Sequence, residues 1–197
     1  MKKVKELVLA SGNTGKLAEF SALLAEQVWQ VRPQSDFQIT SVDETGLSFV
    51  ENALLKARHA AQQTGLPSLA DDSGLAVDAL HGAPGLYSAR YAGPAQNSVA
   101  NYQKLLQVME KVPEQQRTAR YHCVIVYMRH AQDVAPLICQ GSWEGRILKA
   151  PRGKGGFGYD PIFWVESEQA SAAELSAERK HQLSHRGQAL RQLLAEW

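Results

Sequence analysis

The residues most able to do chemistry are the consecutive acids Asp71 and Asp72, which precede Ser73 and Gly74. Two adjacent carboxylates are costly to bring together unless a cation meets them. A hard divalent cation is the natural partner, because Mg²⁺ prefers carboxylate oxygens together with water and phosphate oxygens. The same four residues are also typical of a turn or a helix cap. The motif therefore indicates either a magnesium site at the end of a strand or a simple turn.

A second acidic pair, Asp43 and Glu44, lies just before a helix expected over residues 48–63. Acids at that place can simply favour the helix N-terminus through the helix dipole. A metal site needs carboxylates from more than one segment, so the presence of Asp72 favours the interpretation of Asp43 and Glu44 as metal ligands. Lys56 on the same helix could reach phosphates next to the metal, or be an ordinary solvated lysine.

A candidate phosphate loop follows the first apolar run and precedes residues at helical spacing. A strand-to-helix turn of this kind points backbone N–H groups and the positive end of the helix dipole toward an anion. It is not a Walker loop, because the GxxxxGK[ST] pattern is absent. An ordinary turn with a helix cap is the alternative. The candidate residues are Ser11, Gly12, Asn13, Thr14, Gly15 and Lys16.

The glycine-rich segment 153–161, GKGGFGYDP, is the most unusual stretch of the chain. Glycines let the backbone approach a ligand closely, and Phe157 offers a flat face on which a base can stack, an interaction worth ~1–3 kcal/mol per base. A flexible hairpin tip is the alternative. Further along, His185 and Arg186 supply hydrogen-bond donors near a helix start, with Lys180 upstream. Charged decoration of a helix surface is the alternative there.

Strands and helices alternate along the chain, which predicts an α/β fold with a mixed β-sheet and flanking helices. Residues 120–129 and 136–148 are adjacent and rich in β-formers, so they predict an antiparallel hairpin. The expected strands are residues 8–10, 37–41, 68–70, 120–129, 136–148 and 162–164. The expected helices are a first one through Leu17, Phe20, Leu23 and Leu24, then residues 48–63, 98–112 and parts of 172–197. Residues 81–97 and 151–161 are expected to be mostly loop.

Composition narrows the class of protein. The 197 residues suffice for one domain, or for two lobes around a shared sheet. The formal net charge of +1 offers no field for nucleic acid or a membrane surface, so a phosphate ligand must be held by a local cluster of cations. No apolar run approaches the ~20 residues of a membrane helix. Cys123 and Cys139 lie in apolar stretches, which indicates buried thiols in a reducing compartment, with a disulfide as the alternative.

Six strings together resemble the inosine triphosphate pyrophosphatase family, also called the non-canonical purine NTP or XTP/dITP diphosphatases, and most of all its bacterial branch. They occur in the family's order and cover nearly the whole chain. The strings are SGNTGK at 11–16, ETGLSFVENALLKA at 44–57, ADDSGL at 70–75, GAPGLYSARYAG at 82–93, GGFGYDPIF at 155–163 and SHRGQAL at 184–190.

The resemblance implies a single pyrophosphatase domain over residues 1–197, with two lobes around a central nucleotide cleft, in a cytoplasmic homodimer. It implies magnesium-dependent hydrolysis of dITP, ITP and XTP to the monophosphate and pyrophosphate. Water would attack the α-phosphorus, and donors aimed at the purine 6-oxo group would reject adenine, whose amino group leaves them unpaired.

Roles for individual residues also follow from the resemblance. Glu44 and Asp72 would bind Mg²⁺, and Asp43 would join them at a position where the family is expected to carry a glutamate, so that its shorter side chain needs a bridging water. Asp72 would also be the general base, supported by Asp71, with Lys56 assisting at the triphosphate. Residues 11–16 would hold the triphosphate, and the other substrate contacts would come from Ser73, Phe157, Gly158, Tyr159, Asp160, Lys180, His185 and Arg186.

Two other functions stay open from sequence. A general NTPase or a pyrimidine-directed pyrophosphatase would share the metal site, and an NTPase would release orthophosphate instead of pyrophosphate. A regulatory nucleotide-binding protein would bind without turnover, but the acids at 44 and 72 argue against it, because a pure anion binder gains nothing from carboxylates. No Gly-x-Ser-x-Gly or HExxH motif supports a different hydrolase.

Overall fold

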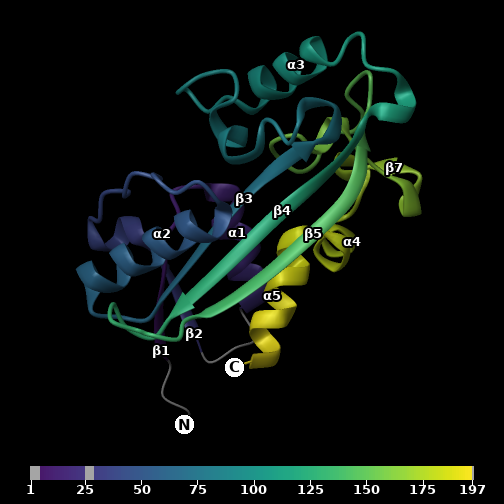
Figure 1. Cartoon of the computed structure of the whole chain (residues 1–197). Coiled ribbons are helices and arrows are strands. Elements are labelled where there is room, and N and C mark those ends of the chain that lie inside the picture. The colour runs from purple at the N-terminus through teal and green to yellow at the C-terminus, as the bar shows by residue number, and fades with distance from the viewer. Residues whose placement is uncertain (1–4, 25–28, 197) are drawn as a thin grey trace. The chain divides into compact units, whose positions relative to one another are not determined.

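Within the described residues, seven strands form one mixed sheet in the order β2-β1-β3-β4-β5-β6-β7. The structure is a computed structural model that describes residues 5–24 and 29–196 (Figure 1). It confirms the predicted α/β class with helices flanking a mixed sheet. The strands are β1 (Lys5–Leu9), β2 (Trp29–Pro33), β3 (Ser68–Val77), β4 (Thr118–Met128), β5 (Leu137–Ile147), β6 (Phe163–Val165) and β7 (Ala170–Ser171), and the α-helices are α1 (Thr14–Leu24), α2 (Phe49–Thr64), α3 (Ser98–Val108), α4 (Ala177–Leu183) and α5 (His185–Glu196).

The chain divides into two compact units. The first unit comprises residues 1–72, 124–139 and 192–197, and the second comprises residues 73–123 and 140–191. Three of the strands, β3, β4 and β5, begin in one unit and end in the other. The prediction of a single domain over residues 1–197 stays a prediction.

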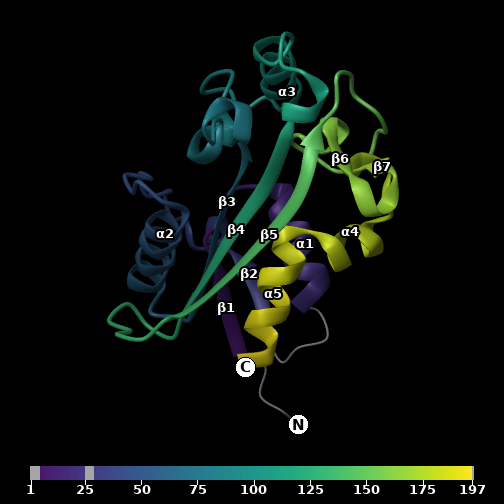
Figure 2. The ribbon, with the colours of Figure 1, turned by 45° about the vertical axis from the view of Figure 1, so that its right-hand side comes forward.

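The first unit is built on parallel strands. β1 pairs in parallel with β2 and with β3, where Leu9 lies opposite Leu69. Because successive side chains of a strand point to opposite faces, Leu7 and Leu9 face one side of the sheet and Val8 the other. Val8 belongs to a core with the alanines of α2, so α2 covers that face. Figure 2 shows α1 and α2 on opposite sides of β1 and β2.

Helix α2 confirms the helix expected over residues 48–63, and its ends follow local chemistry. The Ser48 side chain accepts a hydrogen bond from the Glu51 N–H at the start of the helix. Gly65 ends the helix with φ +69°, the left-handed conformation that glycine adopts without strain. The alanines at 53, 57 and 60 form its buried face, which lets the helix approach the sheet closely.

The strand expected over residues 37–41 is wrong. The second strand is β2, Trp29–Pro33, which lies alongside β1, and the chain then forms a short 3-10 helix over residues 34–37. Proline has no N–H to continue a ladder, and Gln38 takes a left-handed φ of 56°, which ends the short helix. The alternation at 37–41 therefore reflects a coiled segment with half-buried Phe37 and Ile39.

The short strand expected over residues 68–70 is longer than predicted. β3 continues without a break through the two acids to Val77, so the interpretation of residues 71–74 as a turn is wrong. β3 lies between β1 and β4 in the sheet. β3 pairs with β1 at Ser68 and Leu69 and neighbours β4 in the sheet, and this tertiary pairing overrides the turn preference of the Asp-Ser-Gly sequence. Asp72 is the last residue of the first unit and Ser73 the first residue of the second.

The second unit holds its own core under the far parts of β3, β4 and β5. Leu75, Tyr121, Trp143 and Phe163 are buried there with the inward residues of α3. β4 and β5 are neighbours in the sheet and are joined by residues 129–136, a connection too short for anything but an antiparallel pair. This agrees with the predicted hairpin. β5 then pairs antiparallel with β6, and β6 with β7.

The remaining expectations for the elements agree with the structure. α3 covers most of residues 98–112, and α4 and α5 account for much of the tail, whose last residue, Trp197, lies outside the described residues. Cys123 and Cys139 are both buried free thiols. No helix in the described part of the chain is long and apolar enough to cross a membrane.

Candidate active site

The two consecutive acids of β3 serve opposite faces of the sheet. Because side chains alternate along a strand, Asp71 points to the face that α1 covers and Asp72 to the face that α2 covers. The Lys16 Nζ, from α1, lies 2.9 Å from an Asp71 oxygen, and the Lys56 Nζ, from α2, lies 2.7 Å from an Asp72 oxygen. Each buried carboxylate thus meets its own lysine, which explains how a strand can carry two adjacent acids.

Lys56 joins carboxylates from two separate segments. Its Nζ lies 2.9 Å from Glu44 Oε1 as well as 2.7 Å from Asp72 Oδ1. Burial pulls the pKa of the Lys56 ammonium down, but the carboxylates of Asp72, Asp71 and Glu44 outweigh it, so the pKa ends above its ordinary value. Burial likewise raises the pKa of the Asp72 carboxyl, against the opposing pull of Lys56 and Lys16. Lys56 is therefore charged, and Asp72 is a more basic carboxylate than an exposed aspartate.

The loop that carries Glu44 is held by the first turn of α2. The buried side chain of Asn52 accepts a hydrogen bond from the Gly46 N–H at 2.8 Å, and Glu51 accepts one from the Leu47 N–H at 3.0 Å. A Cβ on Gly46 would lie 2.7 Å from the Asn52 oxygen, so the approach requires glycine. Sequence reasoning missed this role of Asn52. The signal in the sequence is an asparagine in the first turn of a helix that begins after a Gly-x-Ser segment.

The acidic groups present fit Mg²⁺. Glu44 and Asp72 converge on one cationic atom, and both supply the hard oxygen ligands that Mg²⁺ prefers. Across residues 5–24 and 29–196, no cluster of three or more His, Cys, Asp or Glu side chains could hold a metal by protein ligands alone. Mg²⁺ is commonly bound by one or two carboxylates together with water and substrate phosphate. Asp43 is exposed, and its part in a metal site stays a prediction.

The candidate phosphate loop opens α1. Asn13 caps the helix, because its side-chain oxygen accepts a hydrogen bond from the Lys16 N–H at 3.0 Å. Ser11 Oγ accepts one from the Asn13 N–H at 3.2 Å. Gly12 is exposed, and a Cβ there would meet nothing within 4 Å. The protein itself does not require glycine at this position, whereas a phosphate bound against the backbone would.

In the second unit, Asp160 organises the glycine-rich segment. Its Oδ2 accepts hydrogen bonds from the Phe157 N–H at 2.8 Å and from the Lys180 Nζ at 2.7 Å. Both charged side chains are buried. The Lys180 Nζ lies 4.7 Å from the centre of the Phe157 ring, and the Arg186 guanidinium lies 5.7 Å from it. Two cationic side chains therefore lie within 6 Å of the Phe157 ring, which is the ring predicted to stack on a base.

His185 and Arg186 stand at a sharp junction between two helices. Ser184 ends α4 in an extended conformation, and its Oγ accepts a hydrogen bond from the Gly187 N–H at the start of α5. His185 and Arg186 are therefore the first two residues of α5, and both are buried. The Arg186 Nη2 donates to Ser73 Oγ at 3.1 Å. The structure thus brings together five of the residues predicted to contact substrate: Ser73, Phe157, Asp160, Lys180 and Arg186.

Two tyrosines clarify how this region is supported. Tyr159, predicted to contact substrate, is buried, and its hydroxyl donates to the Ser88 carbonyl at 2.8 Å. Its side chain serves the core, so a substrate contact from this residue would come from its backbone. Tyr121 stacks on the imidazole of His185. Sequence reasoning missed Tyr121, because an aromatic residue at an inward position of a strand is normally packing alone.

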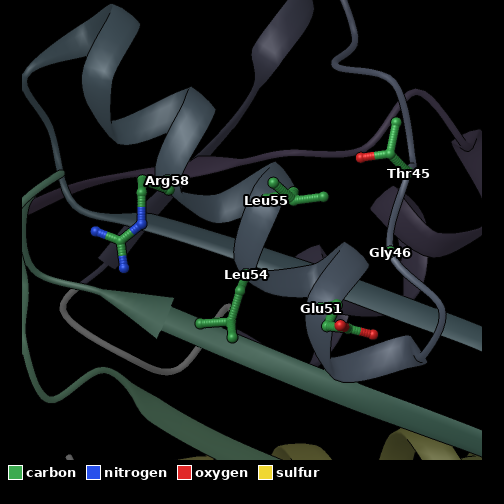
Figure 3. Close-up of a pocket in the computed structure, with 6 residues that line it drawn as sticks. All are labelled: Thr45, Gly46, Glu51, Leu54, Leu55 and Arg58. Atoms are coloured by element: carbon green, nitrogen blue, oxygen red, sulfur yellow. The ribbon is translucent and has the colours of Figure 1, made fainter.

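A separate pocket of about 430 Å³ opens on the outer side of α2 in the first unit. Figure 3 shows Glu51, Leu54, Leu55 and Arg58 along one side of the helix, with Thr45 and Gly46 on the neighbouring segment. Lys56 falls on another side of the same helix because of its 3.6-residue period. None of the predicted site residues lines this pocket.

The fold and the site define a class before any comparison is made. A mixed α/β protein whose first unit pairs buried carboxylates with lysines of α1 and α2, and whose second unit places two cations at an aromatic ring, carries groups that bind phosphate and aromatic ligands. Comparison with known proteins then assigns the family. The chain matches the model of the Ham1 family over residues 7–196, and it belongs to that family.

Relatives and solved structures agree with this assignment. The chain is 57% identical over 192 residues to a protein of Photobacterium profundum, named dITP/XTP pyrophosphatase, with 98% of each chain covered. It is 57% identical over 191 residues to a protein of the same name from Escherichia coli, with 97% of each covered. A HAM1 protein from Coxiella burnetii superposes with a TM-score of 0.90 at 53% identity, covering 98% of this chain and 100% of that one. These findings confirm the resemblance to the bacterial XTP/dITP diphosphatases.

Proposed function

We propose that this protein hydrolyses non-canonical purine nucleoside triphosphates, namely dITP, ITP and XTP, to the monophosphate and pyrophosphate, and so cleanses the nucleotide pool. The family and the names of the relatives in Photobacterium profundum and Escherichia coli support the activity. The observation that carries the proposal is the convergence of Glu44 and Asp72 on the Lys56 ammonium, because it prepares both a cation site and a phosphate-binding charge.

Residues of the first unit act on the triphosphate. The N-terminus of α1, with Lys16 and Lys56, binds phosphate oxygens, since helix N-terminal N–H groups and lysines both favour anions. Asp72 accepts a proton from water as the water oxygen attacks the α-phosphorus. The bond from the α-phosphorus to the bridging oxygen breaks, and pyrophosphate leaves with the electron pair.

Mg²⁺ is the proposed cofactor, with Glu44 and Asp72 as its protein ligands. When bound, it supplies positive charge against the charge that develops on the phosphate oxygens. Lys56 contacts both carboxylates in the structure. With a cation held by those two carboxylates, the Lys56 ammonium would be available to bind phosphate oxygens. Asp71 supports this arrangement by holding Lys16 on the other face of the sheet.

Residues of the second unit choose the base. Phe157 offers its ring for stacking, and Lys180 and Arg186 lie near that ring as donors that cannot accept a hydrogen bond. A 6-oxo purine can accept from them, whereas the 6-amino group of adenine leaves a buried donor unpaired, which is the strongest source of discrimination available to a polar pocket. His185, Gly158, Asp160 and Ser73 complete the proposed base-side contacts.

The finer expectations on assembly and location also belong to the proposal. We expect a homodimer in the cytoplasm. The loop over residues 82–97 is the proposed interface, because Tyr87 within it and Val99 just after it are large apolar side chains that are 62% and 48% exposed. The two free buried cysteines fit a reducing compartment. Sedimentation of the purified chain tests the dimer, with a monomer at micromolar concentration as the contrary result.

The test of the activity is pyrophosphate release from dITP, XTP, dGTP and dATP, each with magnesium and with chelator. We expect strong release from dITP and XTP that requires magnesium, and little from dATP and dGTP. Orthophosphate as the product would point to a general NTPase. Equal rates on all four substrates would overturn the assignment of the base-side residues. They would not affect the assignment of the charge cluster of the first unit to the metal and the phosphates.

A further inference from the structure

The imidazole of His185 lies flat on a neighbouring aromatic ring. The ring centres of Tyr121 and His185 are 4.6 Å apart, and the two planes differ by only 5°. Both residues are buried. A parallel stack at this distance fixes the plane of the imidazole, and aromatic pairs of this kind add stability beyond the area that they bury. The orientation of His185 is thus set from strand β4, which lies far from it in the sequence.

The backbone of His185 is fixed from strand β5 at the same time. A Cβ on Gly141 would lie 2.1 Å from the His185 carbonyl oxygen and 2.9 Å from the Gln188 Cβ. The first turn of α5 therefore lies directly on β5, at a place where only glycine leaves room. With its backbone held by β5 and its ring held by β4, His185 has little freedom to turn toward another partner.

Tyr121 is itself fixed on its remaining sides. Its ring lies 4.7 Å from that of Phe163 and 6.4 Å from that of Trp143, within the core of the second unit. Burial raises the pKa of the Tyr121 phenol well above its ordinary value, so the hydroxyl keeps its proton. That hydroxyl faces Asp160 Oδ1 at 3.5 Å. One side chain therefore contacts both His185 and the carboxylate that holds Phe157 and Lys180.

We propose that Tyr121 is a positioning residue for base selection, which holds His185 through its ring and the glycine-rich segment through Asp160. The proposal rests on the proposed function, because it assigns selectivity to the same group of residues. The ligand selected in this way is a purine whose 6-position accepts a hydrogen bond. A pocket can reject an amino group only if its donors cannot rotate to relieve the mismatch.

The test compares three variants of the full-length protein. Tyr121→Leu removes the stack, Tyr121→Phe keeps the ring but removes the hydroxyl, and Phe163→Leu removes a fully buried aromatic that contacts Tyr121. Phe163→Leu is the matched control, because it weakens the same core while Trp143 still packs on Tyr121 and the Tyr121 ring still stacks on His185. For each protein, kcat/KM for pyrophosphate release is measured with dITP and dATP, together with the thermal midpoint and the ¹H shift of the His185 imidazole.

We expect Tyr121→Leu to lower the preference for dITP over dATP about 10-fold, chiefly through KM for dITP. Tyr121→Phe should keep most of the wild-type preference, because its ring can still stack on His185. Phe163→Leu should lower the thermal midpoint but keep the preference within about 2-fold. In the wild type and in Tyr121→Phe, ring current from residue 121 should shift the His185 proton upfield. Tyr121→Leu should lose most of that shift, because the remaining ring, that of Trp143, is centred 6.5 Å from the imidazole against 4.6 Å for Tyr121.

Two results would overturn the inference. One is a Tyr121→Leu variant whose preference falls no further than that of Phe163→Leu. The other, which does not depend on any variant folding, is a wild-type His185 proton without an upfield shift. Failure of the proposed function gives a different result, because the wild type would then release no pyrophosphate from dITP.

Discussion

The charge cluster of the first unit and the base-side residues of the second hold their carboxylates in different ways. In the first, Glu44 and Asp72 share the ammonium of Lys56. In the second, the carboxylate of Asp160 accepts a backbone N–H as well as Lys180, and an aromatic stack fixes a neighbouring imidazole. A flexible lysine can give way to a metal or a phosphate, whereas a backbone contact and a stack cannot. The difference suits one region to exchanging partners during a reaction and the other to rejecting ligands of the wrong shape.

The largest effect is expected from removing the general base in the first region. Asp72→Asn keeps the size of the side chain but cannot accept the proton from water, so kcat should fall by about 10³-fold or more on every substrate. The affinity for dITP, measured by calorimetry, should stay within about 3-fold. Asp78→Asn is the matched control, because Asp78 is an exposed acid that pairs with Arg120. Turnover retained in Asp72→Asn would remove this residue from the role of base.

The next effect should appear in the second region and should change selectivity instead of rate. Arg186→Gln removes a buried guanidinium that accompanies Phe157. A hydrogen bond to a charged group is worth about 1.5–3 kcal/mol, so the preference for dITP over dATP should fall about 10- to 100-fold. Competition kinetics with both nucleotides measures it. Arg191→Gln, on the same helix, should leave the preference intact, and an equal loss in both variants would argue for a general effect on α5.

A smaller effect is expected from the residue that holds the Glu44 loop. Asn52→Leu keeps the volume of the side chain but removes the acceptor for the Gly46 N–H. Groups that orient a metal ligand typically change metal affinity by about 10-fold or more. The magnesium concentration for half-maximal rate should therefore rise about 10-fold, with kcat nearly restored at saturation. Binding of Mn²⁺ to the nucleotide-free protein gives a readout independent of turnover, and the exposed Gln62→Leu on the same helix is the control.

The smallest effect concerns stability alone, at the turn between β4 and β5. Asp133 accepts hydrogen bonds from the Arg129 side chain and from the backbone N–H groups of Arg129 and Ala135, and these hold its pKa far below the usual range. A carboxyl whose pKa is lower in the folded state stabilises the protein above its unfolded pKa of ~3.9, and that stability is lost as the pH falls through the folded pKa.

Asp133→Asn should therefore lower the thermal midpoint at pH 7 by roughly 2–5 °C, and the gap to the wild type should shrink steadily below about pH 4. Activity per folded molecule should not change, since Asp133 lies outside both regions. Asp36→Asn, which alters an exposed pair with Arg32, should change the midpoint little. A gap that stayed constant down to pH 2 would contradict the assigned cause of the lowered pKa.

Local chemistry made some elements predictable and left others out of reach. The cap residues of α2 are readable from sequence, because Ser48 and Gly65 act on neighbours a few positions away. The strand through Asp71 and Asp72 was not, because its extended form depends on its place beside β4 in the sheet and on lysines from α1 and α2. Local patterns singled out most of the candidate site residues, and the family resemblance gave them their roles. The role of Asn52 depends on a contact with Gly46 within one string, whereas Tyr121 acts through His185 and Asp160, which lie far from it in the sequence.

We assign the phosphates of the substrate to the charge cluster of the first unit and the base to the residues of the second unit. The most direct measurement is mapping of backbone amide shifts on the labelled protein with two fragments of the substrate, magnesium tripolyphosphate and deoxyinosine. We expect tripolyphosphate to shift the amides of residues 11–16, 44, 56 and 72, and deoxyinosine to shift those of residues 157–160, 180, 185 and 186. Deoxyinosine acting on the first set, or both fragments acting on one set alone, would contradict this assignment.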